Sequence, residues 1–333
     1  MSINYLSFND TVSHLVCSTS NGFIIYALSP SIQKKVIEDK KGAIGIMKIL
    51  KRTNICAFSG TNVSSFTYNS ITTTKNTVIL WDNHEQKTII QVDCGENIKN
   101  ISIITDIMLV ILEYKILVIT FDGKTLNAKT TYSNPNGICE IVGDSEPTIA
   151  TLGNHKGEIC IWKLHIDTNK IIQAHDGNIE CLALNRSGNL VASASERGTL
   201  IRIFNCQTGR QIYEFRRGTN PTQIFSIAFS WDDKYLVCSS GNGTVHIYEL
   251  YEENTVSNKN TQSMFFGFKD YLPAWVSSEW SYKQHYLNTY AKSLCSFDET
   301  GAIHIVTYDG KYFKISGKSF DMFSTTDMLI NSK

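Results

Sequence analysis

Two similar six-residue segments lie 45 residues apart in the chain, Ile179-Glu180-Cys181-Leu182-Ala183-Leu184 and Ile224-Phe225-Ser226-Ile227-Ala228-Phe229. A Ser-x-x-Gly-Thr turn follows each of them, formed around Ser195, Gly198 and Thr199 in the first copy and around Ser240, Gly243 and Thr244 in the second. A recurrence at about 40–45 residues with several short strands per unit is the signature of propeller blades. The matched pair therefore predicts an all-β fold built from repeated blades.

Strand and turn signals recur along the whole chain, which contains only 5 prolines. We divide it into seven units, in which the matched pair supplies units five and six. Apolar strand runs in the other units include residues 22–26, 77–82, 108–112, 157–162 and 302–306. Unit seven also has a last strand of its own at 311–315, so ring closure need not borrow a strand from the amino terminus. We therefore expect a single domain over residues 1–333, a WD40-like seven-bladed β-propeller with mostly four-stranded blades.

Composition and charge exclude several classes of protein. Hydrophobic residues make up 42% and charged residues 19%, as in a globular chain. Lysine plus arginine and aspartate plus glutamate both total 31, which argues against nucleic-acid binding through excess positive charge. The 9 cysteines are scattered without a CxxC pair, which favours a reduced, cytosolic compartment. The apolar stretch 101–121 contains three charged residues, so we expect two strands joined by a turn there and no membrane helix.

The segment Phe215-Arg216-Arg217-Gly218 lies where unit five passes into unit six. Neighbouring side chains on a strand leave by opposite faces, so Arg216 and Arg217 cannot easily share one ligand but can serve two pockets. Each guanidinium is a planar fork suited to bidentate contact with phosphate. Gly218 keeps Cβ bulk away from whatever approaches the adjacent backbone.

This segment resembles the FRRG signature of the PROPPINs, a family of β-propellers that bind polyphosphoinositides and include the WIPI-type autophagy proteins. Residues 174–175, 192–202 and 244–248 read like blades five and six of that family, while 78–82 and 134–139 resemble its blade-two and blade-four landmarks. The similarity thus spans nearly the whole chain.

The resemblance implies two headgroup sites, one on each side of the arginine pair. The implied contacts are His175, Ser193, Ser195, Gly198, Thr199, Arg202, Arg216, Arg217, Gly218, Ser240, Thr244 and His246. Their chemistry fits independently, because phosphate requires forked cations, hydroxyl donors and exposed backbone N–H groups. Taken singly, Ser193, Thr199 or His246 is more often a strand or turn residue with a satisfied side chain. Their clustering around the arginines favours the binding site.

An insertion at 252–275 interrupts unit six. Its polar stretch 252–263 precedes Met264-Phe265-Phe266-Gly267-Phe268. Two interpretations remain open: Met264, Phe265, Phe266 and Phe268 contact the membrane, or Phe265, Phe266 and Phe268 form the last strand of unit six and pack inward. The insertion is short for the family, which weakens the case for a membrane-inserting amphipathic helix. The segment 65–76 has no proline and a single basic residue, Lys75, whereas relatives commonly have proline and basic residues in this region, which helps them engage a lipid-transfer protein.

By resemblance, the function is non-catalytic binding to phosphatidylinositol 3-phosphate and phosphatidylinositol 3,5-bisphosphate at a membrane surface. The protein would be cytoplasmic and peripheral on autophagosomal precursor, endosomal or vacuolar membranes, with lipid-transfer or conjugation-machinery proteins of autophagy as partners. No catalytic fingerprint or metal-ligand spacing occurs in the sequence, so we expect neither an enzyme nor a cofactor. The alternative is a WD-type protein-interaction scaffold without a lipid site.

Overall fold

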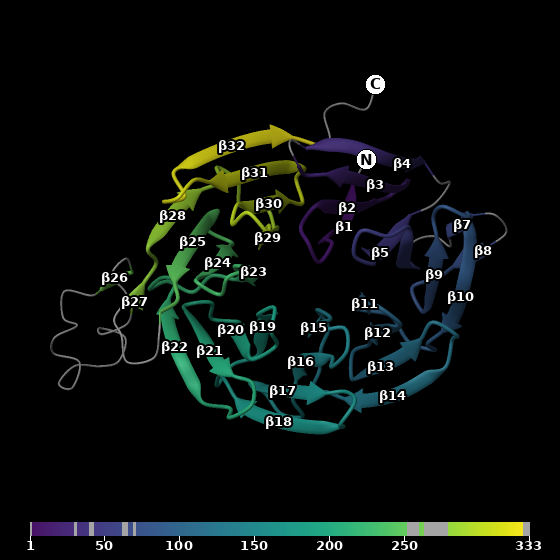
Figure 1. The fold of residues 1–333 in the computed structure, drawn as a ribbon, viewed down its shortest axis with the longest axis horizontal. Coiled ribbons are helices and arrows are strands. Elements are labelled where there is room, and N and C mark those ends of the chain that lie inside the picture. Colours follow the sequence, from purple (N-terminus) through teal and green to yellow (C-terminus); the bar gives the residue numbers. More distant parts are fainter. Residues whose placement is uncertain are drawn as a thin grey trace. The chain divides into compact units, whose positions relative to one another are not determined.

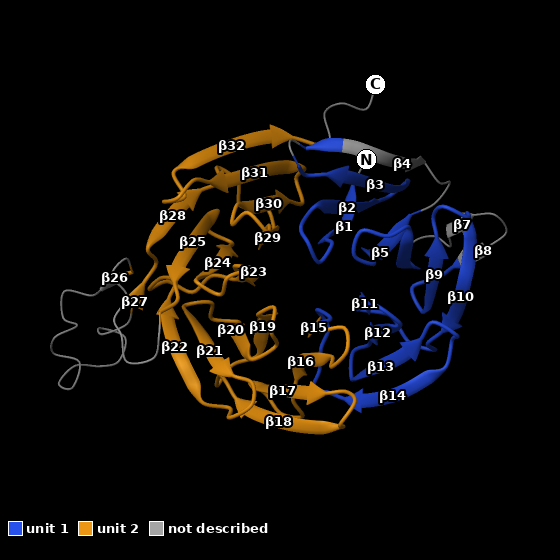
Figure 2. Ribbon diagram, viewed as in Figure 1, with its two compact units in different colours: residues 1–139 blue, residues 140–333 orange. Residues whose placement is uncertain are grey.

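The computed structural model describes residues 2–29, 32–39, 43–61, 66–68, 71–251, 260–262 and 279–328. All regular secondary structure in these ranges is β-strand. Within the same ranges there is no helix of the length and apolar character needed to cross a membrane. The chain forms two compact units, Met1–Cys139 and Glu140–Lys333, which Figure 2 colours separately.

The described part of the first unit contains three four-stranded sheets and a two-stranded ribbon (Figure 1). Sheet one comprises β1 (Ile3–Phe8), β2 (His14–Thr19), β3 (Gly22–Ala27) and β4 (Gln33–Asp39), in that order. Sheet two comprises β5 (Ile44–Ile49), β6 (Ile55–Gly60), β9 (Thr77–Asp82) and β10 (Lys87–Asp93). The ribbon pairs β7 (Phe66–Tyr68) with β8 (Ile71–Thr73). Sheet three comprises β11 (Asn100–Ile104), β12 (Ile107–Ile111), β13 (Lys115–Thr120) and β14 (Thr125–Thr130).

The described residues of the second unit form four further sheets in chain order (Figure 1). Sheet four comprises β15 (Cys139–Val142), β16 (Thr148–Leu152), β17 (Glu158–Lys163) and β18 (Thr168–Gln173). Sheet five comprises β19 (Ile179–Leu184), β20 (Leu190–Ser195), β21 (Leu200–Asn205) and β22 (Gln211–Arg216), extended by β27 (Glu279–Trp280) and β26 (Thr261–Gln262). Sheet six comprises β23 (Ile224–Phe229), β24 (Tyr235–Ser240), β25 (Thr244–Glu249) and β28 (Lys283–Tyr286). Sheet seven comprises β29 (Ser293–Phe297), β30 (Ile303–Thr307), β31 (Lys311–Ser316) and β32 (Met322–Asp327).

The repeat found in the sequence corresponds to a repeat in strand register. In sheet five, β19 pairs with β20 from Ile179↔Ser195, and the register shifts before Cys181. In sheet six, β23 pairs with β24 from Ile224↔Ser240, and the register shifts at the same place, before Ser226. A bulge of this kind bends a strand and increases its twist. Sheets five and six therefore share their backbone irregularity as well as their apolar pattern.

The apolar core between sheets five and six fixes the strand that carries the arginine pair. The ring of Phe215 lies 4.8 Å from that of Tyr248 and 5.5 Å from that of Tyr213, stacked in both cases. Phe215 and Tyr248 are fully buried. Burying one such side chain contributes about 1.5–3 kcal/mol, so β22 is anchored immediately before Arg216.

Three sequence predictions need correction. The outer strand paired with β25 is β28, so the interpretation in which Phe265, Phe266 and Phe268 supply the last strand of unit six is wrong. The stretch 101–121 contributes to three strands, β11, β12 and β13, because two short turns divide it where one was expected. The segment 311–315, predicted to be the last strand of unit seven, is the third strand of sheet seven, β31, and the fourth is β32. Sheet seven is still completed without a strand from the amino terminus, as expected.

All nine cysteines are free thiols, and eight of them are buried. Burial raises the pKa of Cys17 and of Cys56 to about 12. These thiols therefore stay protonated near neutral pH and pack as small apolar side chains, as the sequence indicated.

Candidate phosphate-binding site

Arg216 and Arg217 leave the end of β22 towards different sheets. In sheet five, Ser193, Arg202 and Glu214 occupy one row of paired residues, and Arg216 lies two residues beyond Glu214 on the same face. Phe215, between them, points to the opposite face and into the core shared with sheet six. Arg217 follows on that second side, where its charge acts on His246. The alternation expected from the sequence is present.

The sheet-five cluster comprises His175, Ser193, Arg202, Glu214 and Arg216, and most of these side chains are hydrogen-bonded within the protein. His175, in the connection between β18 and β19, lies 3.0 Å from Ser193 Oγ through its Nε2. Arg202 donates from Nε to Glu214 Oε2 at 2.8 Å and from Nη1 to the carbonyl of Ala174 at 2.7 Å. Burial, with the nearby charge of Arg202, lowers the pKa of His175 from 6.5 to about 4. His175 is therefore neutral at physiological pH.

Arg216 is the least satisfied group of this cluster. Its side chain is only 8% exposed, and its Nε has no hydrogen-bond partner within the described part of the chain. Burial lowers the pKa of its guanidinium, while the carboxylate of Glu214 raises it and the charge of Arg197 lowers it. Buried polar groups are almost always paired, so the unpaired buried N–H of this cation makes Arg216 a candidate contact for an anion.

Two hydroxyl groups lie at the end of sheet five that carries the arginine pair. Ser195 ends β20 and Thr199 immediately precedes β21, and both residues are largely buried. Within the described ranges neither hydroxyl has a hydrogen-bond partner. A phosphate group bound near the arginine pair would find two further donors here.

The sheet-six cluster is a chain of hydrogen bonds. Ser240 Oγ lies 2.9 Å from Thr244 Oγ1, which lies 3.1 Å from His246 Nε2. His246 Nδ1 in turn lies 3.1 Å from Ser281 Oγ. Burial, together with the charge of Arg217, lowers the pKa of His246 to about 4. This side therefore presents neutral hydroxyl and imidazole groups beside one cation.

Arg217 also has a structural role. Its Nε donates to the carbonyl of Gly198 at 2.8 Å and its Nη2 to that of Asn220 at 2.5 Å, while its backbone N–H donates to the carbonyl of Thr199 at 2.9 Å. These bonds tie the turn before β21 to the segment after β22. Part of its donor capacity is thus already used within the protein.

Glycine is required at two of the turns and not at Gly218. Gly198 and Gly243 have φ values of +57° and +68°, and a Cβ would lie 1.7 Å from the carbonyl oxygen of Thr222 or 2.3 Å from that of Thr289. A Cβ on Gly218 would meet nothing within 4 Å. No described residue therefore occupies the space that Gly218 leaves.

The structure brings the predicted residues together in two clusters within the second unit. Sequence reasoning missed Glu214, Ser281 and the backbone pairing of β28 with β25. Glu214 could have been found, because it lies two residues before Arg216 and so shares its strand face. The predicted membrane contacts Met264, Phe265, Phe266 and Phe268 lie outside the described residues.

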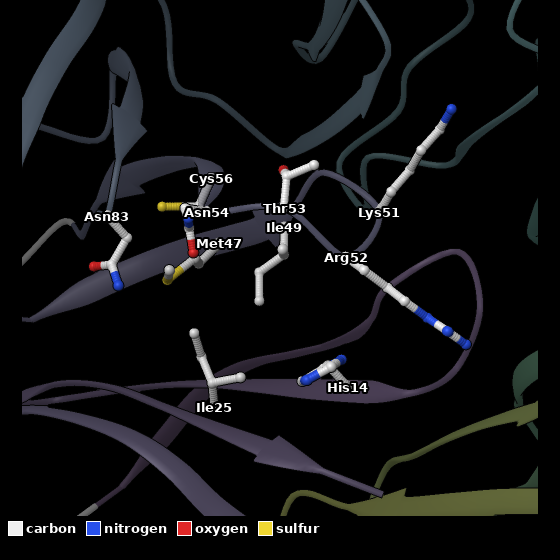
Figure 3. Close-up of a pocket in the computed structure, with 10 residues that line it drawn as sticks. All are labelled: His14, Ile25, Met47, Ile49, Lys51, Arg52, Thr53, Asn54, Cys56 and Asn83. Atoms are coloured by element: carbon white, nitrogen blue, oxygen red, sulfur yellow. The ribbon is translucent and has the colours of Figure 1, made fainter. Parts of the chain in front are cut away.

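A separate pocket lies in the first unit and contains none of the predicted residues. It measures about 180 Å³ and has an apolar floor that includes Ile25 and Met47 (Figure 3). Lys51 and Arg52 at its rim donate to Thr105 Oγ1 at 3.3 Å and to Thr11 Oγ1 at 3.2 Å. Both cations thus have protein partners, unlike Arg216 Nε. In the described ranges, histidine, cysteine and carboxylate side chains do not gather in a group able to hold a metal ion.

The sequence model of the PROPPIN family matches residues 2–312. The chain belongs to the PROPPIN family. A relative within the curated proteins is autophagy-related protein 18e of Arabidopsis thaliana, which is 28% identical over 311 residues, or 92% of this chain and 81% of the relative.

Solved PROPPIN structures show the same fold. Hsv2 from Kluyveromyces marxianus superposes with a TM-score of 0.76 at 20% identity and covers 98% of this chain and 97% of its own. KlAtg21, solved in complex with the coiled coil of AgAtg16, gives a TM-score of 0.73 at 20% identity and covers 98% of both chains. The predicted fold is confirmed: this PROPPIN is an all-β, seven-bladed β-propeller with mostly four-stranded blades.

Proposed function

We propose that this PROPPIN binds phosphoinositide headgroups at two sites and is thereby recruited to membranes without catalysing a reaction. One site lies on the side of Arg216, with His175, Ser193, Ser195, Thr199 and Arg202. The other lies on the side of Arg217, with Ser240, Thr244 and His246. The preferred lipids are phosphatidylinositol 3-phosphate and phosphatidylinositol 3,5-bisphosphate.

The observation that carries this proposal is the buried Nε of Arg216, which has no partner among the described residues. A guanidinium in that state costs free energy in the unliganded protein, and a phosphate that reaches it removes the cost. The free hydroxyls of Ser195 and Thr199, the open space at Gly218 and the family membership support the same ligand.

Two sites on one rigid unit make membrane binding bivalent. Once the first headgroup is bound, the second is met at a high effective concentration, so each site can be individually weak. This arrangement suits a peripheral adaptor, which must attach firmly to lipid-rich membrane and detach when the lipid is consumed.

We further propose that the adaptor acts in autophagy or in endosomal and vacuolar traffic, on autophagosomal precursor, endosomal or vacuolar membranes. The named relatives are autophagy proteins, and one solved neighbour was studied with an autophagy coiled coil. Lipid-transfer or conjugation-machinery proteins are therefore the partners we expect. A WD-type scaffold without lipid binding is the competing function, and it requires that Arg216 and Arg217 be irrelevant to membrane recruitment.

The deciding experiment is vesicle flotation with and without phosphatidylinositol 3-phosphate. The unaltered protein should bind only vesicles that carry the lipid, and Arg216→Thr combined with Arg217→Thr should abolish this binding. Arg210→Thr, an exposed arginine of the same unit, is the matched control and should bind normally.

The double variant loses the Arg217 bonds to Gly198 and Asn220, so its thermal unfolding must be measured alongside. Arg216→Thr alone removes no side-chain hydrogen bond within the described residues and tests the headgroup role in an undisturbed fold. Full vesicle binding by the folded double variant would refute the proposed site and favour the scaffold.

A further inference from the structure

Two exposed tyrosines border the sheet-six cluster. Tyr286 ends β28 and is 66% exposed, and Tyr290 follows in the connection to β29 and is 80% exposed. Neither hydroxyl has a hydrogen-bond partner in the described part of the chain. Exposed apolar groups that gather beside a candidate site can mark a contact surface.

Strand register places Tyr286 at the outer border of the site. Ser240 pairs with Thr244, and Thr244 pairs with Tyr286 across the next strand. Residues directly opposite on antiparallel strands point to the same face, so the three form one row that ends at the outer edge of sheet six. Tyr286 therefore continues the line of the two hydroxyl residues towards solvent.

Tyr290 lies beside the turn that precedes this row. A Cβ on Gly243 would lie 3.6 Å from Cδ1 of Tyr290. The turn that carries Tyr290 is fixed, because the buried Leu287 donates its N–H to the Gly243 carbonyl at 2.8 Å and Thr289 Oγ1 donates to Asp309 Oδ2 at 2.8 Å. Both tyrosines are thus held in position without being buried.

The other face of β28 explains why Tyr286 points outwards. His285 lies 2.9 Å from the carbonyl of Phe320 through its Nε2, and its ring stacks on Phe323 of sheet seven at 5.5 Å. Since neighbouring side chains alternate, Tyr286 is directed away from sheet seven and towards the side of Arg217.

We propose that Tyr286 and Tyr290 contact the interfacial zone of the lipid bilayer around the headgroup bound at the sheet-six site. Tyrosine has an apolar ring and a polar hydroxyl, and it is enriched where one end is apolar and the other wet. A headgroup at Thr244 and His246 brings the membrane surface to this edge of sheet six. The inference rests on the proposed function and adds a contact independent of residues 264–268.

The test compares vesicles with a soluble headgroup. Tyr286→Ser combined with Tyr290→Ser should weaken binding to phosphatidylcholine vesicles containing phosphatidylinositol 3-phosphate by about tenfold, about 1.4 kcal/mol. Binding of inositol 1,3-bisphosphate, measured by calorimetry, should change by less than about twofold, because it makes no interfacial contact. Replacing both residues by Trp should preserve vesicle binding. Tyr114→Ser, at a tyrosine of the first unit that is 58% exposed, is the matched control and should have no effect.

The outcomes separate the two proposals. Normal vesicle binding by the double Ser variant, in a protein whose binding depends on Arg216, would overturn the tyrosine contact alone. Equal losses for vesicles and for the soluble headgroup would also overturn it, since the tyrosines would then line the pocket. If the unaltered protein bound neither probe, the proposed function would fail and this inference with it.

Discussion

Sheets five and six carry the same turn and the same bulge, yet the polar groups beside them are organised differently. The sheet-five side has a cation, Arg216, with an unpaired Nε, next to an ion pair between Arg202 and Glu214. The sheet-six side has a cation, Arg217, bonded to two carbonyls, next to a chain of neutral hydrogen bonds ending at His246.

This difference in hydrogen bonding shows that the same backbone repeat can carry two candidate sites with different polar surroundings. In both sheets the bulge and the glycine turn set the course of the backbone. The surrounding side chains then determine how many hydrogen-bond donors of each arginine remain unused. Under the proposed function, Arg216 serves the ligand alone, whereas Arg217 both binds the ligand and supports the fold.

The glycine turns of sheets five and six are equivalent, and substitutions in them should have the largest effect on stability. Gly198→Ala and Gly243→Ala should each lower the free energy of unfolding by at least about 3 kcal/mol, because both positions combine positive φ with a close carbonyl oxygen. Chemical denaturation of the two variants measures this. Gly218→Ala is the control and should leave stability unchanged, since its Cβ would meet no described atom. A large loss of stability in only one of the two turn variants would show that the two turns are not equivalent.

Arg216 and Arg217 differ in their hydrogen bonding, and this difference predicts the second-largest effect on stability. Arg217→Thr should cost about 2–3 kcal/mol, because its bonds to Gly198 and Asn220 are charge-assisted and largely buried. Arg216→Thr should stay within about 0.5 kcal/mol, because it removes an unsatisfied donor. Thermal and denaturant unfolding of both variants checks the contrast, and equal losses would show that Arg216 has a structural role too.

A shared property of the two sides is the low pKa of His175 and His246, about 4 in each case against an ordinary 6.5. Between these values the unfolded chain binds more protons than the folded protein, so stability should fall as pH decreases from 6.5 towards 4. Each histidine contributes a slope of up to about 1.4 kcal/mol per pH unit. Denaturation at several pH values should show a shallower slope for His175→Gln and for His246→Gln, and an unchanged slope in both would contradict the assigned environments.

The smallest predicted effect concerns single hydroxyls. Thr244→Val breaks the bonds to Ser240 and His246 and should cost about 1 kcal/mol. Ser195→Ala removes a hydroxyl without a described partner and should be nearly neutral for stability, yet it should weaken binding of inositol 1,3-bisphosphate. Calorimetric binding and unfolding of both variants provide the comparison. A stability loss at Ser195 equal to that at Thr244 would mean that its hydroxyl is used within the protein.

The blade repeat and the arginine pair could be read from the sequence because both are local. The 45-residue repeat, the alternation of apolar residues and the order Phe215-Arg216-Arg217 depend on neighbours along the chain. Strand geometry then requires the two arginines to point to opposite faces, and the structure agrees. Even the pairing of Arg202 with Glu214 follows from strand alternation once β21 and β22 are placed side by side.

Only the tertiary structure decided which strand completes sheet six. β28 follows β25 after an interval of more than thirty residues, and no local pattern marks Lys283–Tyr286 as its partner rather than the apolar run at 264–268. The same long-range pairing brings Ser281 to His246 and Tyr286 to Thr244. The unequal use of Arg216 and Arg217 is likewise tertiary, because it depends on whether a carbonyl from a distant turn lies within reach of each guanidinium.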